Sequence, residues 1–230
     1  SGHQQVKLQP DDIRFYLCAR RLNSLIRGRE DALKVAQVLG WRAPSGERGI
    51  FAPFIPVAGW LASLNPYFRL ECLELDPQCV AFFGDLRSLP VAEARSALDA
   101  ALERIANGER IGRGAYYLTS ENFWQAGAPS LLPFFPNLFD AYRGSEEARE
   151  LLMDIARTVN SSVLRDQVMA LCGSHAKVLE YADALQYVLA AGNRRDRVRL
   201  RAEALKSKKL SERSARVLIE SCAWDTLDAA

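Results

Sequence analysis

Helical segments that follow one another with almost no connecting sequence are the feature that most constrains this chain. From Ser145 onward, apolar residues recur at helical spacing, and each run ends at a short break such as Asn160-Ser161 or Gly192-Asn193. Turns this short join helices that pack antiparallel to their neighbours. The pattern predicts helices at 145–159, 162–172, 175–191, 194–207 and 212–222.

The first half of the chain is helical in pattern but less regular. An amphipathic helix is predicted to follow Pro90 and to end at Gly108. Asp11 and Asp12 are expected to cap an earlier helix. The stretch from 41 to 56 is rich in glycine and proline, which predicts a loop. No segment alternates apolar and polar residues convincingly enough to predict a strand.

Successive helical hairpins without strands predict an all-α fold. We expect an irregular α-solenoid of HEAT-like or armadillo-like hairpins, with a compact helical bundle as the alternative. Residues 1–6 are interpreted as a tag scar and disordered start. Residues 7–144 are expected to form an irregular helical subdomain and residues 145–230 helical-hairpin repeats, the two making one continuous domain.

The composition is that of a globular protein of a reducing compartment. Hydrophobic residues make up 49% of the chain and charged residues 25%, which is enough to support a sizeable core. The five cysteines show neither a CxxC pair nor a disulfide framework, so we expect them to be reduced and mostly buried. No apolar run is long enough to span a membrane and no signal peptide is visible, which favours a cytoplasmic protein without a membrane partner.

No pattern in the sequence predicts a catalytic residue, a metal site or a cofactor. His175 follows Cys172 by three residues, but Gly173-Ser174 is expected to break the helix between them. Residues 112–117, Gly-Arg-Gly-Ala-Tyr-Tyr, are similar to the nicotinamide-side strand of ADP-ribosyltransferases. The strand-rich scaffold of such enzymes is missing, so this phrase is interpreted as a loop between helices.

Two further groups of residues are interpreted as structural. Asn65-Pro66 and Asp76-Pro77 are typical of helix starts, where Asn or Asp accepts hydrogen bonds from free N–H groups. The aromatic residues that might line a ligand pocket are interpreted as core, because no polar group accompanies them to orient a ligand. They are Trp60, Phe68, Phe82 and Phe83.

Positive charge is concentrated near the C-terminus. The formal net charge is +2, yet residues 194–209 alone carry +6, which leaves −4 for the rest of the chain. Val198, Leu200, Ala204 and Leu205 are expected to leave some apolar surface beside these charges. An acidic protein partner, or another domain of a parent chain, suits such a surface; nucleic acid comes second because no nucleic-acid motif accompanies it. The predicted partner-binding residues are Arg194, Arg197, Arg201 and Lys208.

Several phrases between residues 12 and 107 resemble the helical region that follows the nucleotide-binding domain in bacterial NACHT/STAND-type NTPases. The first phrase is Asp12-Ile13-Arg14-Phe15-Tyr16-Leu17-Cys18-Ala19-Arg20-Arg21-Leu22. The others are Gly59-Trp60-Leu61-Ala62-Ser63-Leu64-Asn65-Pro66, then Leu73-Glu74-Leu75-Asp76-Pro77, then Gly84-Asp85-Leu86-Arg87-Ser88-Leu89-Pro90. The resemblance implies a parent that senses a trigger, often in antiphage defence, and switches its oligomeric state.

The function expected from these observations is non-catalytic. No G-x-x-x-x-G-K-[ST] loop is present, so the chain would be a helical sensing, regulatory or protein-interaction region without the ATPase of its parent. A free-standing helical adaptor is the first alternative. A helical effector enzyme, such as a transferase or a ubiquitin ligase, is the second.

Overall fold

The computed structural model describes residues 10–108, 120–173, 178–206 and 211–227. These ranges contain thirteen α-helices and a single two-stranded sheet, which confirms the all-α class. Contacts divide the chain into two compact units, residues 1–104 with 108–128 and residues 105–107 with 129–230. The solenoid architecture and the subdomain boundary at 144/145 stay predictions. None of the helices in the described ranges has both the length and the apolar character needed to cross a membrane.

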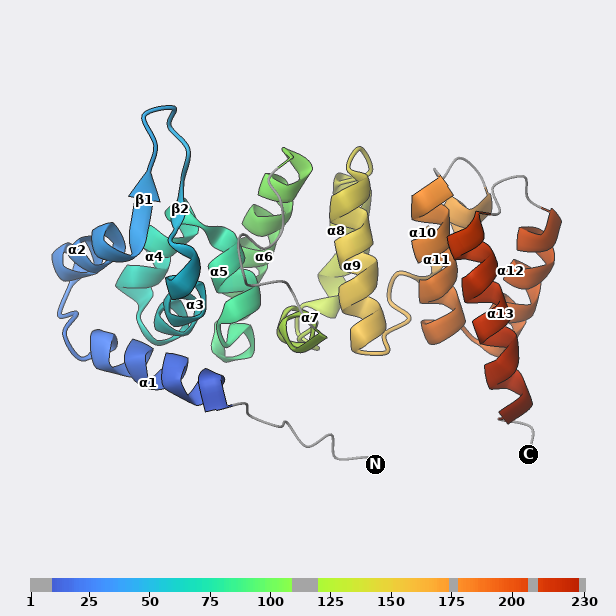
Figure 1. The fold of residues 1–230 in the computed structure, drawn as a ribbon, viewed down its shortest axis with the longest axis horizontal. Coiled ribbons are helices and arrows are strands. Elements are labelled where there is room, and N and C mark those ends of the chain that lie inside the picture. The colour runs from blue at the N-terminus through green and yellow to red at the C-terminus, as the bar shows by residue number, and fades with distance from the viewer. Residues whose placement is uncertain (1–9, 109–119, 174–177, 207–210, 228–230) are drawn as a thin grey trace. The chain divides into compact units, whose positions relative to one another are not determined.

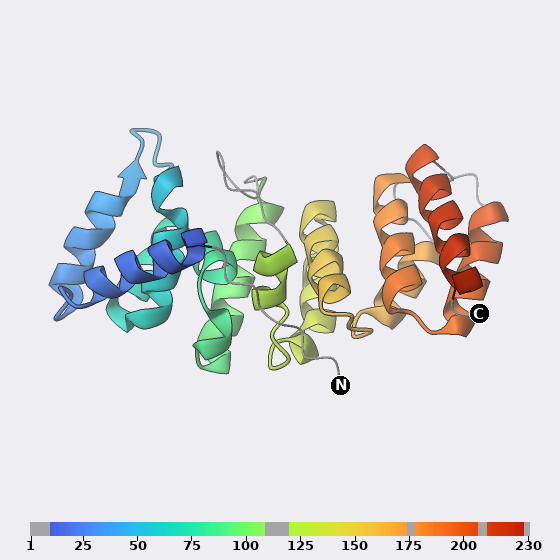
Figure 2. The ribbon, with the colours of Figure 1, turned by 60° about the horizontal axis from the view of Figure 1, so that its bottom comes forward.

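The first unit is built on the apolar helix α3, which packs against α1, α4 and α5 (Figures 1 and 2). Its short apolar residues Ala58, Leu61 and Ala62 have no exposed surface. Such complete burial is possible because neighbouring helices cover α3 on several sides. The α-helices of this unit are α1 (Pro10–Asn23), α2 (Arg29–Leu39), α3 (Ile55–Leu64), α4 (Pro66–Leu75), α5 (Pro77–Phe83), most of α6 (Val91–Ala106) and α7 (Ser120–Ala126), with 3-10 turns at Ala52–Phe54 and Leu86–Ser88.

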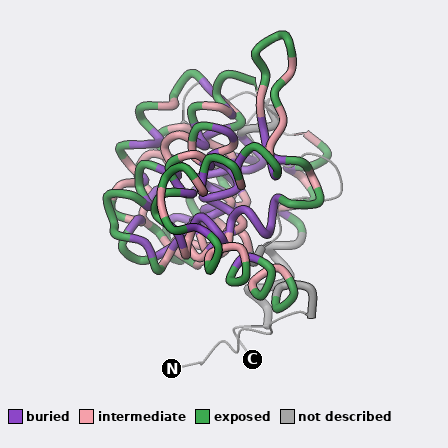
Figure 3. The backbone as a smooth tube through the Cα atoms, turned by 90° about the vertical axis from the view of Figure 1, so that its left-hand side faces the viewer, coloured by how far each residue is buried: buried purple, intermediate pink, exposed green. Residues whose placement is uncertain are grey.

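A small β-hairpin corrects the prediction of a loop over residues 41–56. Strand β1 (Gly40–Arg42) pairs antiparallel with β2 (Arg48–Ile50), with Trp41 opposite Gly49. The Trp41 ring lies 3.2 Å from the position that a Cβ would take at Gly49, so the indole covers the glycine backbone. Gly46, in the tip, has a φ of +91°, a conformation that favours glycine. The tip is exposed (Figure 3), and strands of three residues are too short to show alternation.

Two glycines allow α3 and α5 to approach closely. A Cβ at Gly59 would lie 2.5 Å from the carbonyl carbon of Phe83, and one at Gly84 would lie 2.4 Å from the Gly59 oxygen. Ser63 closes the same contact, because its hydroxyl donates to the Gly59 oxygen and accepts from the Asp85 N–H at 2.7 Å. Gly84 and Asp85 therefore end α5 and also pack the end of that helix against α3.

The two Asx-Pro phrases both start helices, but only one of them caps as predicted. Asn65 accepts a hydrogen bond from the Phe68 N–H at 3.0 Å at the start of α4. Asp76 occupies the equivalent position before α5, yet its carboxylate accepts no capping bond there; it lies 4.0 Å from Arg104. Asp11 and Asp12 lie within the first turn of α1, which begins at Pro10, instead of preceding it.

The second unit centres on α11, which packs against α9, α10, α12 and α13 (Figure 1). Tyr187 of α11 is 1% exposed, and its hydroxyl donates to the Ser161 carbonyl and accepts from the Leu164 N–H. This one side chain satisfies two backbone groups of the connection between α9 and α10. The helices are α8 (Phe135–Ala141), α9 (Glu146–Thr158), α10 (Arg165–Gly173), α11 (Val178–Ala191), α12 (Arg194–Lys206) and α13 (Glu212–Leu227), after a 3-10 turn at Leu132–Phe134.

We predict that Gly59→Ala destabilises the protein by about 2 kcal/mol or more, because the new methyl group meets backbone atoms that cannot move aside. Urea unfolding followed by circular dichroism measures the effect. Gly28→Ala is the matched control, since no atom lies within 4 Å of its added Cβ, and it should change stability by less than about 1 kcal/mol. Equal stability of the two variants would contradict the close α3–α5 contact.

Candidate interaction surface

Helix α12 carries most of the basic residues that the sequence singles out, and its inner face is defined by burial. Asp196, Leu200 and Ala204 are spaced four residues apart and are at most 4% exposed. The helix is capped by Asn193, whose side-chain oxygen accepts from the Asp196 N–H at 2.9 Å. This burial corrects one prediction, because Leu200 and Ala204 face the core and offer no docking surface.

A bidentate ion pair with Arg165 holds the Asp196 side chain on the buried side of α12. Arg165 of α10 donates from Nε to one carboxylate oxygen at 2.5 Å and from Nη2 to the other at 2.7 Å. These hydrogen bonds hold the pKa of Asp196 below its ordinary value, and the same contacts raise the pKa of Arg165. Asp196 is therefore ionised at neutral pH, but its charge is engaged on the inner side of α12.

Three of the four predicted contact residues lie together on one side of α12. Arg194 is exposed, and Arg197 and Arg201 are half-buried at the edge of the inner face. The Nε of Arg197 is buried without a hydrogen-bond partner. Lys208 lies outside the described residues. The structure thus places Arg194, Arg197 and Arg201 as a group, and their role in binding stays a prediction.

A second group of arginines lies along the other edge of the exposed surface of α12. Arg195 and Arg199 are exposed there. Between the two groups of arginines lies Val198, which is 58% exposed. We use the name α12 outer face for Arg194, Arg195, Arg197, Val198, Arg199, Arg201 and Ala202. Guanidinium groups of this density attract carboxylates or phosphates, and they contain no nucleophile or general base.

A carboxyl cluster in the same unit was not predicted. Buried Asp183 of α11 pairs with Arg213 of α13, and Asp154 of α9 lies 2.7 Å from Arg157. Glu150 of α9 is hydrogen-bonded to Asp183, which leaves three carboxyl groups facing two guanidinium groups. Burial first, and then the negative charge of Asp183, raises the pKa of Glu150 to about 7. Sequence analysis missed this cluster because its members come from three helices.

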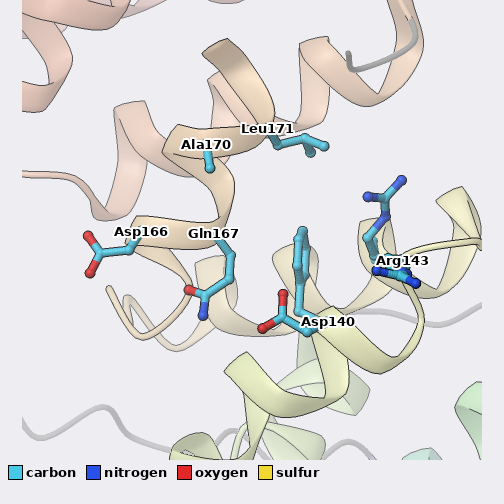
Figure 4. A pocket seen from close by; sticks show the side chains of 8 residues that line it. Asp140, Arg143, Asp166, Gln167, Ala170 and Leu171 are labelled. Carbon is cyan, nitrogen blue, oxygen red and sulfur yellow. The ribbon is translucent and has the colours of Figure 1, made fainter. Parts of the chain in front are cut away.

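An open pocket of about 410 Å³ lies between α8, α9 and α10 (Figure 4). Phe139 and Leu171 supply apolar lining, and Arg149 lies with its guanidinium carbon 5.7 Å from the Phe139 ring centre. Charges of both signs border it, and Asp166 is already 2.8 Å from Arg165. The lining therefore selects neither an anion nor a cation. The residues are Phe139, Asp140, Arg143, Arg149, Asp166, Gln167, Ala170 and Leu171.

The aromatic residues interpreted as core pack as expected. Phe68 and Phe82 have no exposed surface. Trp60 and Phe83 are half-buried, and the Trp60 ring meets Tyr16 edge-on at 5.4 Å between ring centres. These contacts join α1 to α3.

The described cysteines are free thiols in different surroundings. Cys72 and Cys79 are buried, Cys172 is half-buried and Cys18 is exposed. Burial, and a hydrogen bond with Cys72, raise the pKa of the Cys79 thiol well above its ordinary value, which makes it unreactive. His175 and the 112–117 phrase lie outside the described residues, as does the side chain of Cys222. Within the described ranges, no group of three or more His, Cys, Asp or Glu side chains has a geometry that could hold a metal ion.

Comparison with protein-family models, with curated protein sequences and with solved structures finds no match to this chain.

We predict that Glu150→Gln gains stability relative to the wild type as the pH rises from about 5 to 8. A folded-state pKa of about 7 lies above the unfolded value near 4.3, so protonated Glu150 stabilises the fold at low pH, and this contribution is lost as the pH rises through 7. Glutamine keeps the neutral hydrogen-bonding group at every pH.

Thermal unfolding midpoints at pH 5 and pH 8 test this prediction. Glu147→Gln, at an exposed position of the same helix, is the control and should not show a relative gain at pH 8. A Glu150→Gln variant that tracks the wild type across this range would show that Glu150 titrates as an ordinary surface carboxyl.

Proposed function

We propose that this chain is a non-catalytic helical region of a larger STAND-type NTPase, in which it regulates or senses through protein contacts. The observation that carries the proposal is the α12 outer face, where five arginines surround Val198 while Asp196, the acidic residue of the first turn, is engaged by Arg165. Its partner is an acidic protein or an acidic surface of another domain of the parent. The free thiols of the described cysteines suit a reducing location, which we take to be the cytoplasm.

The NTPase context rests on the sequence resemblance, and the first unit is compatible with it. Gly59, Ser63, Asn65 and Gly84 belong to the resembling phrases, and each makes a packing or capping contact. These phrases are therefore explained by helix packing, without any need for an active site. A parent with this region in antiphage defence would keep its nucleotide chemistry in a different domain.

A free-standing adaptor is the alternative with the same surface. The two differ in the parent reading frame, because only the STAND-type proposal requires a phosphate-binding G-x-x-x-x-G-K-[ST] loop upstream. If the complete reading frame that encodes this chain contains no such loop, the NTPase proposal is wrong and the adaptor proposal remains.

We predict that Arg194→Glu with Arg197→Glu weakens the activity and assembly of the full parent protein without unfolding it. Reversing two charges should weaken association at about 50 mM salt and matter less at about 500 mM, because salt screens such contacts. Sedimentation of the parent at both salt concentrations and its cellular activity are the measurements.

Arg42→Glu, at an exposed position of β1 in the first unit, is the control for a general effect of charge reversal. Identical behaviour of the α12 and Arg42 variants at both salt concentrations would mean that the α12 outer face is a solvated surface. A drop in unfolding temperature of the α12 variant alone would assign the arginines a structural role instead.

A further inference from the structure

The open pocket between α8, α9 and α10 carries two opposite charges that are not paired with each other. Asp140 belongs to the last turn of α8, Arg143 to the turn that follows it, and both are exposed. The Arg143 N–H donates to the Asp140 carbonyl at 3.4 Å, so the two residues are one helical turn apart. In the part of the chain that the structure describes, neither side chain forms an ion pair. Both charges are therefore available to a ligand.

The two charges lie on different sides of the pocket. Figure 4 shows Asp140 and Gln167 of α10 on one side and Arg143 on the other. Gln167 is half-buried, and its amide has no hydrogen-bond partner among the described residues. Asp166 also borders the pocket, but its carboxylate lies 2.8 Å from Arg165. One side of the pocket thus offers a carboxylate with a neighbouring amide, and the other a guanidinium.

The pocket also has an apolar part and a limited size. Phe139 is 4% exposed, Leu171 is half-buried, and both line the pocket. The Arg149 guanidinium carbon lies 5.7 Å from the centre of the Phe139 ring and adds positive charge to the lining. A volume of about 410 Å³ is at the lower end of the range of about 300–1,000 Å³ that is typical of small-molecule sites.

We propose that this pocket binds a small zwitterion, a free α-amino acid with an apolar side chain. The ammonium group of the ligand lies beside Asp140 and the Gln167 amide oxygen, and its carboxylate lies beside Arg143. The apolar side chain of the ligand packs against Phe139 and Leu171. This inference goes beyond the proposed function, and it uses none of the arginines of α12.

Ligands of simpler charge fit this lining less well. An anion would meet the carboxylate of Asp140, and a cation would meet Arg143 and Arg149. A neutral apolar molecule would displace water from charged groups without replacing the lost hydrogen bonds. A zwitterion supplies a partner of the right sign to each side, through charge-assisted hydrogen bonds. Because exposed ion pairs contribute little, we expect a dissociation constant on the order of 1 mM.

The experiment is an NMR titration of the intact 230-residue chain, labelled with nitrogen-15, with L-leucine. N-acetyl-L-leucine, which lacks the ammonium group, and L-leucinamide, which lacks the carboxylate, are the matched probes. We expect leucine to bind about fivefold more tightly than either probe, because each probe loses one exposed ion pair. Shifts should be largest at the amides of residues 139–143 and 166–171.

Two charge-removing variants should respond to the probes in a crossed pattern. Asp140→Asn should weaken leucine binding about fivefold and leave N-acetyl-leucine nearly unchanged, since that probe has no ammonium group to lose. Arg143→Gln should weaken leucine equally and leave leucinamide nearly unchanged. Arg42→Gln and Glu47→Gln, at exposed positions of the β-hairpin, are the controls and should change neither. General loss of structure would not produce such a pattern.

Three results would overturn the proposal. The first is the absence of shifts in residues 139–143 and 166–171 at leucine concentrations up to about 20 mM, well above the expected dissociation constant. The second is equal binding of leucine and N-acetyl-leucinamide, which carries no charge. The third is tighter binding of inorganic phosphate than of leucine at the same amides, which would make the pocket an anion site. None of them bears on the α12 outer face, so the proposed function stands or falls separately.

Discussion

The ion pair between Arg165 and Asp196 is the interaction on which the surface chemistry of the second unit depends. It joins α10 to α12 through two hydrogen bonds and fixes which side of α12 faces inward. With Asp196, Leu200 and Ala204 committed to the inner face, the arginines of the same helix are placed outside or at its edges. A buried charge without its partner would be costly, so the pair also constrains how α12 can rotate about its axis.

In the first unit, close backbone packing between α3 and α5 fixes how the helices lie against each other. Gly59 and Gly84 leave no room for a side chain where α3 meets α5, and Ser63 adds hydrogen bonds at the same place. Glycine phrases of this kind attract functional interpretations because they also occur in binding loops. Here the surrounding atoms are backbone and helix, which accounts for the residues structurally.

The sequence predicted the helical class, the five C-terminal helices to within a few residues, and the grouping of Arg194, Arg197 and Arg201, because all of these follow from local periodicity. It missed the hairpin at Gly40–Ile50, where each strand has three residues. It also assigned Leu200 and Ala204 to a docking surface, since spacing alone does not say which side of a helix is inward. The cluster of Glu150, Asp183 and Arg213 could not be predicted from sequence spacing, because its residues belong to different helices.

The most direct test of this account is the ionisation of Asp196, measured by carbon-13 NMR of its side-chain carboxyl in the intact protein. If Arg165 holds it inward, its pKa lies below the ordinary value near 3.9, and Arg165→Gln either raises it or lowers the stability of the protein. A carboxyl that titrates at the ordinary value in both proteins would contradict the account. Asp196 would then be a solvent-facing charge that neutralises the arginines of α12, and the basic surface would not exist as described.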